Sequence, residues 1–147
     1  MIGGGQTIYT LGTSTRSEAE FIHLLKGNEI QIVVDVRRFP TSRFEHFKRE
    51  TLTHLLRRAE IDYLYLGGEL GGYREGGYRT FIASAEFKQG LAELEKVATQ
   101  KRAALICAER LPWRCHRRFI AGKLEEGGWQ VNHIIDEKRT WGAKKII

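Results

Sequence analysis

The chain has 147 residues, enough for one domain with a buried core, so we expect a single α/β domain over residues 1–147. No apolar run approaches the roughly 20 residues that span a bilayer, and the amino terminus lacks the basic and apolar regions of a signal peptide. We therefore expect a cytoplasmic protein without a membrane partner. With 24 Lys+Arg against 18 Asp+Glu, the formal net charge of +6 favours an anionic partner or, alternatively, a solvated basic surface.

Short apolar runs predict five buried strands, at residues 7–11, 31–36, 63–66, 103–107 and 131–135. Helical patterns lie between them. The first helix follows a capping box, Ser17-Glu-Ala-Glu20, in which the glutamate can reach back to the cap, and Gly27 is placed to end it.

Three further helices are indicated by leucines and phenylalanines at helical spacing. They cover positions 52–59, positions 87–98 after a cap at Ser84, and positions 119–124 before Gly127-Gly128. Strands that alternate with helices imply a three-layer sandwich of about five mostly parallel strands, with helices on both faces. The pattern does not determine the strand order.

Every strand-to-helix loop of a parallel sheet opens on the same edge, and ligands bind there. Four polar segments should meet at this edge, at residues 12–17, 35–43, 67–79 and 107–118. Together they hold eleven arginines or lysines, counting Lys48 just beyond, so we expect a basic cleft. The candidate anion-binding residues are Ser14, Arg16, Arg37, Arg38, Arg43, Glu69, Tyr73, Arg74, Arg110, Arg114 and Arg117.

Both cysteines fall in the stretch Cys107-Ala-Glu-Arg-Leu-Pro-Trp-Arg-Cys-His-Arg-Arg118. Cys107 ends a predicted strand that faces cations, which lower a thiol pKa, so it is a candidate nucleophile; the alternative is a buried, inert thiol. The arginine that a phosphatase loop needs six positions after its cysteine is replaced by Trp113. We expect free thiols in a reducing compartment, with a Cys107–Cys115 disulfide as the alternative.

Cations also crowd the start of the fourth helix, where the helix dipole is positive. The residues concerned are Arg114, His116, Arg117 and Arg118. Each such placement costs about 0.3–1 kcal/mol when exposed, a penalty that a bound anion would remove. Alternatively, Asp35, Glu69 and Glu109 neutralise the cluster.

Asp35 and Glu109 each end a strand and can meet across the cleft as a carboxylate pair for acid and base catalysis, with His116 as a proton carrier. Ion pairing with nearby arginines is the alternative for each carboxylate. The spacing of Cys107, Cys115 and His116 does not match the usual zinc sites, so we expect neither a metal nor another cofactor.

Residues 71–79 repeat Gly-Gly-Tyr-Arg, and the segment reads either as a mobile lid or as an ordinary surface loop. Its alternating tyrosines and arginines suit stacked bases and phosphates. Phe39, Phe44 and Trp113 would extend this stacking surface or simply pack the loops together.

These motifs occur together in one known family. They are Gly12-Thr-Ser14, Asp35-Val-Arg-Arg-Phe-Pro-Thr-Ser-Arg43, Glu69-Leu-Gly-Gly72 and the cysteine stretch. Over nearly its whole length the chain resembles domain of unknown function family 488. The resemblance implies a compact α/β domain and brings no activity with it.

Its signature residues here are Ser14, Asp35, Arg37, Arg38, Pro40, Arg43, Glu69, Leu70, Gly71, Cys107, Glu109, Arg110, Arg114, Cys115, His116 and Arg117. A weaker likeness is to rhodanese-like domains, which also pair a Val-Asp-Val-Arg strand end with a cysteine that closes a later strand. Here the cysteine loop is longer, so the anion cradle of that family does not transfer to Cys107.

The leading functional expectation is an enzyme, of hydrolase or lyase type, that acts on a phosphate-bearing substrate such as nucleic acid or a nucleotide. A nucleic-acid-binding module without catalysis is the second reading. The third is a cysteine-dependent sulfurtransferase or phosphatase-like enzyme that uses Cys107. The sequence does not indicate the oligomeric state.

Overall fold

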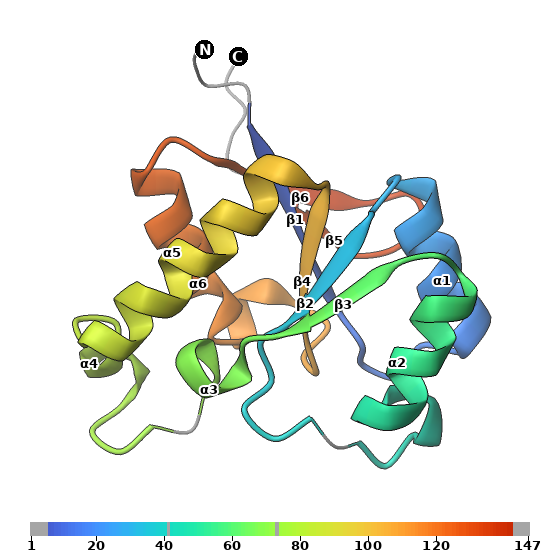
Figure 1. Ribbon diagram of the computed structural model, residues 1–147, viewed down its shortest axis with the longest axis horizontal. Helices are drawn as coiled ribbons and strands as arrows, with labels where there is room; N and C mark the ends of the chain where they lie inside the picture. Colours follow the sequence, from blue (N-terminus) through green and yellow to red (C-terminus); the bar gives the residue numbers. More distant parts are fainter. Residues whose placement is uncertain (1–5, 41, 73, 143–147) are drawn as a thin grey trace.

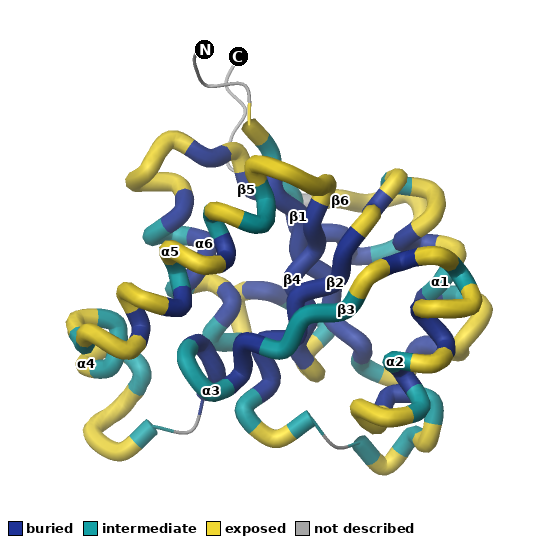
Figure 2. Tube along the Cα trace, in the orientation of Figure 1, coloured by how far each residue is buried: buried dark blue, intermediate teal, exposed yellow. Residues whose placement is uncertain are grey.

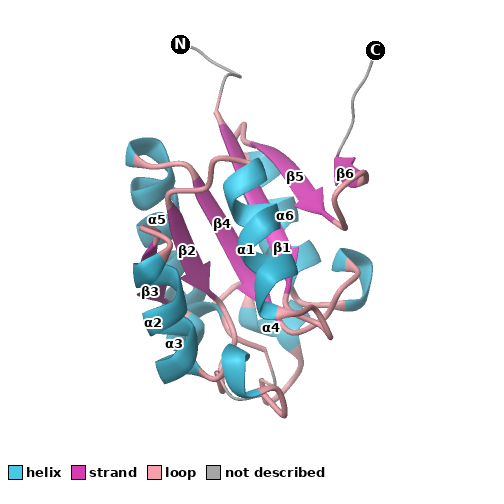
Figure 3. Cartoon of the chain, turned by 90° about the vertical axis from the view of Figure 1, so that its right-hand side faces the viewer, coloured by secondary structure: helices cyan, strands magenta, loops and turns pink. Residues whose placement is uncertain are grey.

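The computed structural model describes residues 6–40, 42–72 and 74–142. Its sheet has the strand order β3-β2-β4-β1-β5-β6. The parallel strands are β1 (Thr7–Gly12), β2 (Ile32–Asp35), β3 (Asp62–Tyr65), β4 (Ala103–Cys107) and β5 (Gln130–Ile134). The arrows of β2 and β5 point the same way in Figure 3. The five predicted strands are thus confirmed. β6 (Thr140–Gly142), antiparallel to β5, was missed because three residues are too few to show a period.

Helices cover both faces of the sheet (Figure 1), which confirms the three-layer prediction. α1 (Glu18–Gly27) and α2 (Arg49–Arg58) lie on one side. α5 (Ala85–Gln100), α6 (Arg117–Glu126) and the short α3 (Gly67–Leu70) lie on the other. Two single 3-10 turns, η1 (Glu45–Phe47) and η2 (Pro112–Arg114), precede α2 and α6.

Serines cap two of the predicted helices. The Ser17 hydroxyl accepts from the backbone N–H of Glu20 at 3.0 Å, and the Ser84 hydroxyl from that of Phe87 at 3.1 Å. The Glu20 carboxylate instead pairs with Arg16 at 2.9 Å. The return bond of the predicted capping box is therefore replaced by an ion pair.

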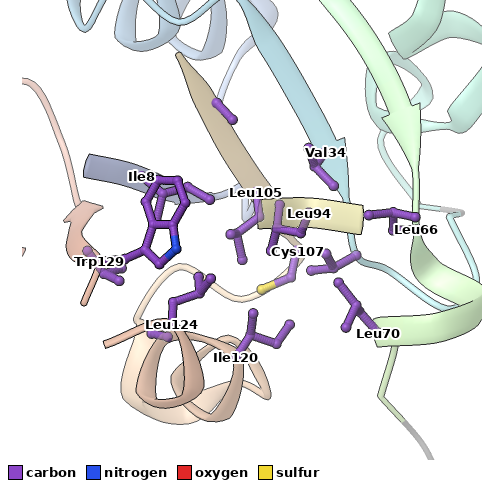
Figure 4. Close-up of a cluster of buried hydrophobic side chains, with 14 of the residues drawn as sticks. Ile8, Val34, Leu66, Leu70, Leu94, Leu105, Cys107, Ile120, Leu124 and Trp129 are labelled. Carbon is purple, nitrogen blue, oxygen red and sulfur yellow. The ribbon is translucent and has the colours of Figure 1, made fainter. Parts of the chain in front are cut away.

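The core consists of two apolar layers, one on each face of the sheet, because successive strand side chains alternate in direction. In β4, Leu105 and Cys107 point toward α6 and pack near Ile120 (Figure 4), whereas Ala104 and Ile106 face α1 and α2. Figure 2 shows the buried strands between helices whose outer sides are exposed. Residues adjacent in a strand therefore belong to different layers.

The glycine-rich segment after β3 contains two short helices that the sequence did not predict, α3 and α4 (Tyr78–Phe81). The Tyr78 hydroxyl donates to the backbone oxygen of Leu70 at 2.7 Å, and its ring meets Phe87 edge-on. Tyr78 is thereby fixed against the core. Tyr73, the other tyrosine of the repeat, lies outside the described residues.

Within the ranges that the structure describes, no helix has both the length and the apolar character needed to cross a membrane.

Candidate thiol and anion site

A pocket of about 680 Å³ opens at the carboxyl edge of the sheet, beside the start of α6. Three of the four predicted polar segments line it. The lining residues are Arg37, Arg38, Phe39, Gly72, Tyr78, Cys107, Ala108, Glu109, Arg114, Cys115 and His116.

The fourth polar segment, residues 12–17, supports the pocket from outside its lining. The Ser14 N–H donates to the Ala108 oxygen at 2.8 Å, so the end of β1 holds the start of the cysteine stretch. A Cβ atom at Gly12 would lie 1.9 Å from the Glu109 oxygen, and only glycine permits this approach. The segment fixes the path of the cysteine stretch.

Cys115 precedes His116, the N-cap of α6, and is partly exposed in the pocket lining. Its sulfur accepts from the backbone N–H of Arg117 at 3.3 Å and lies 3.5 Å from His116 Nδ1. A hydrogen bond from Cys107, together with those from His116 and the Arg117 backbone, outweighs burial and lowers the pKa of Cys115 to about 4. Cys115 is therefore a thiolate at neutral pH.

His116 is held in one orientation. Its Nε2 lies 3.0 Å from the backbone oxygen of Val36, and because a carbonyl only accepts, Nε2 carries a proton there. Nδ1 is then the nitrogen that faces the Cys115 sulfur. Tyr78 packs edge-on against the ring, and Gly72 leaves room for it, since a Cβ atom there would lie 3.3 Å from Nδ1.

Cys107 has a different environment. Its side chain is buried among core residues such as Leu105 and Ile120 (Figure 4), and burial raises its pKa well above that of an ordinary thiol. Both cysteines are free, so the pair of thiols expected from the sequence is the observed state. The setting that lowers a thiol pKa is at Cys115, which was not predicted as a site residue from the sequence. The sequence feature that could have indicated it is the run His-Arg-Arg, which follows Cys115 and begins a predicted helix.

Asp35 lies on the opposite face of the sheet from Cys107, toward α1 and α2, and does not line the pocket. Two nitrogens of Arg37, Nε and Nη2, each donate to its carboxylate at 2.8 Å, and the Tyr63 hydroxyl donates at 2.6 Å. The structure therefore shows the ion-pair alternative. The expected meeting of Asp35 with Glu109 across the cleft does not occur, since only Glu109 lines the pocket.

Three of the predicted arginines line the pocket, and they differ in charge balance. The Arg37 guanidinium is buried and neutralised by Asp35. Arg114 is exposed, and Arg38 is half-buried with its guanidinium over the Phe39 ring at 5.3 Å. Arg38 and Arg114 are thus the less buried of the three arginines in the lining.

Two further predicted arginines are fully buried and bind the protein's own backbone. Arg16 donates to the oxygens of Gly12 and Ile135, both at 2.6 Å. Arg117 donates to the Glu109 oxygen and to the Thr10 hydroxyl, both at 2.7 Å. These side chains stabilise the loops around the pocket, and neither of them lines it.

The remaining predicted residues within the described ranges lie outside the pocket lining. They are Ser14, Arg43, Glu69, Arg74 and Arg110. Arg74 donates to the Gly71 oxygen at 2.8 Å and stacks on Phe81, so it stabilises the segment after α3.

The sheet and the pocket define an α/β domain that carries a cysteine–histidine pair and two arginines at the carboxyl edge of a parallel sheet. The chain belongs to the family described as Domain of unknown function DUF488, whose model matches residues 17–124. This match includes every residue that lines the pocket. No curated protein matches the chain. Its function is therefore argued from the site.

Proposed function

We propose that this protein is an enzyme in which the Cys115 thiolate attacks a phosphate-bearing substrate. The observation that carries the proposal is the alignment of three groups: Cys115 Sγ lies 3.5 Å from His116 Nδ1, and His116 Nε2 is fixed by the Val36 oxygen at 3.0 Å. A nucleophile, a base within reach and a third group that orients the base form the arrangement of an activated cysteine.

The charge of the pocket supports an anionic substrate. Arg38 and Arg114 offer planar guanidinium groups, which bind phosphate oxygens with two hydrogen bonds each. Among the lining residues that the structure describes, Glu109 is the one carboxylate beside these two arginines. The start of α6 adds the positive end of a helix dipole.

In the proposed reaction, the proton of the Cys115 thiol resides on His116 and the arginines hold the phosphate oxygens. The thiolate forms a bond to phosphorus while the bond from phosphorus to the leaving oxygen breaks. The leaving oxygen keeps that electron pair and takes the proton from His116. Water, deprotonated by His116, then attacks phosphorus, releases phosphate and restores the thiolate. We assign the binding of the incoming water to Glu109, the carboxylate of the described pocket lining.

Alkylation by iodoacetamide, read by peptide mass analysis, tests the nucleophile. We expect the rate of Cys115 alkylation to rise with pH and to reach half its maximum near the Cys115 pKa of about 4. The buried Cys107 should remain unmodified. Inorganic phosphate should slow the reaction in a saturable way. A rate that rises only near the ordinary thiol pKa of about 8.5, or that ignores phosphate, contradicts the proposal.

Turnover supplies the second readout. Phosphate release from an aryl phosphate monoester should be lost in Cys115→Ser and reduced about a hundredfold in His116→Gln. Arg57→Ala, an exposed position on α2, is the control and should behave as the unaltered protein.

A second candidate function is sulfur transfer, which a pocket lined by both Cys107 and Cys115 favours. In this reaction the Cys115 thiolate attacks the outer sulfur of thiosulfate, sulfite leaves with the electron pair, and Cys115 becomes a persulfide. Intact-mass analysis after incubation with thiosulfate tests it. A gain of one sulfur atom that requires Cys115 supports sulfur transfer, and an unchanged mass excludes it for this donor.

A further inference from the structure

The two most exposed large apolar side chains among the described residues belong to two loops that both contribute residues to one pocket. Phe39 is 60% exposed and lines the pocket, and Trp113, 44% exposed, directly precedes the lining residue Arg114. The two side chains come from loops far apart in the sequence. Exposed apolar groups that gather at one place mark a binding surface more often than groups scattered singly.

Arginines lie beside both loops, one over the Phe39 ring and one against the Trp113 backbone. Arg38 lies over the Phe39 ring at 5.3 Å, and Arg118 donates to the Trp113 backbone oxygen at 3.1 Å. The neighbouring Arg43 is exposed and lies over Phe44 at 5.2 Å. Rings interleaved with cations are suited to nucleic acid, because bases stack on rings and on guanidinium planes while the cations meet phosphates.

We propose that the pocket mouth binds the phosphate-bearing end of a single-stranded nucleic acid, with bases stacked on Phe39 and Trp113. This inference rests on the proposed function, since it places the terminal phosphate beside Cys115. A single strand fits better than a duplex, because only unpaired bases expose their faces to side chains. The pocket of about 680 Å³ lies within the range of small-ligand sites and so holds the terminal nucleotide.

Fluorescence anisotropy with labelled oligothymidylates of about eight nucleotides tests this inference. The Cys115→Ser protein is used so that the end phosphate persists. We expect tighter binding with a 5′- or 3′-terminal phosphate than with hydroxyl ends, weaker binding to the matching duplex, and a steep fall in affinity with salt.

Phe39→Ala and Trp113→Ala should each weaken binding about tenfold or more, whereas Phe39→Tyr and Trp113→Phe keep a ring and should retain most of the affinity. Arg57→Ala, across the sheet on α2, is the charge control and should change little. Binding that is indifferent to both aromatic residues, or equal for duplex and single strand, overturns the inference. Such a result leaves the proposed function intact where Cys115 still reacts near pH 4 and is protected by inorganic phosphate. Conversely, nucleotide binding without a reactive Cys115 removes the catalytic proposal alone.

Discussion

Asp35→Ala is expected to lower the free energy of unfolding by about 3–5 kcal/mol, because it leaves the buried Arg37 guanidinium without its counter-charge. The side chains of both residues are almost fully buried, with 0% of Asp35 and 5% of Arg37 exposed. The Tyr63 hydroxyl loses its acceptor as well. Urea unfolding measures the loss as a shift of the midpoint.

The exposed pair between Lys101 and Asp62 supplies the matched control. Asp62→Ala removes the same charge at the surface, where we expect a change of at most about 1 kcal/mol. Replacing both buried partners, Asp35→Leu with Arg37→Met, should recover part of the stability, since no unpaired charge remains. If Asp35→Asn left stability unchanged but abolished turnover, Asp35 would be catalytic, as the sequence suggested.

Asp35 illustrates which features could be predicted from the sequence: its strand was, but the direction of its side chain was not. The apolar runs and the serine caps predicted the five parallel strands and the four long helices because burial and capping are local signals. The same runs placed Asp35 and Glu109 at one edge of the sheet. Proximity to an edge does not decide which face a side chain takes, and Asp35 lies on the side opposite Cys107.

The alternation of β2 contained this information. Val34 and Val36 pack toward α5 and α6, so the residue between them must point toward α1 and α2. The burial of Arg16 and Arg117 had no comparable signal. Their partners are mostly backbone oxygens at the ends of β1, β4 and β5, which composition and spacing do not reveal.

The sequence predicted that the cationic start of α6 binds an external anion, or alternatively that nearby acidic side chains neutralise it. The structure places the protein's own Cys115 sulfur on the Arg117 N–H at this helix end, while the Arg117 side chain turns back toward Thr10. The thiolate supplies the negative charge that the helix dipole favours. In the proposed function, Arg38 and Arg114 of the pocket lining then bind the substrate anion.

Cys107→Ala is expected to raise the pKa of Cys115, because the hydrogen bond from Cys107 is the largest cause of its low value. Below its pKa a thiol reacts about tenfold more slowly for each unit by which the pKa rises, so alkylation near pH 5 should slow by about tenfold or more. Cys107→Ser retains a hydroxyl donor at the same position and should keep the pKa of Cys115 low.

The comparison of these two variants separates two roles for Cys107. If Cys107 only donates a hydrogen bond, the serine variant stays reactive at Cys115 and the alanine variant does not, while unfolding in urea shows both to be folded. If Cys107 were the nucleophile, as the sequence analysis considered, both variants would lose alkylation and turnover together. Equal, unchanged reactivity in both would show that the Arg117 N–H and His116 suffice to hold the thiolate. The expected order therefore makes Cys107 a positioning residue that acts through Cys115.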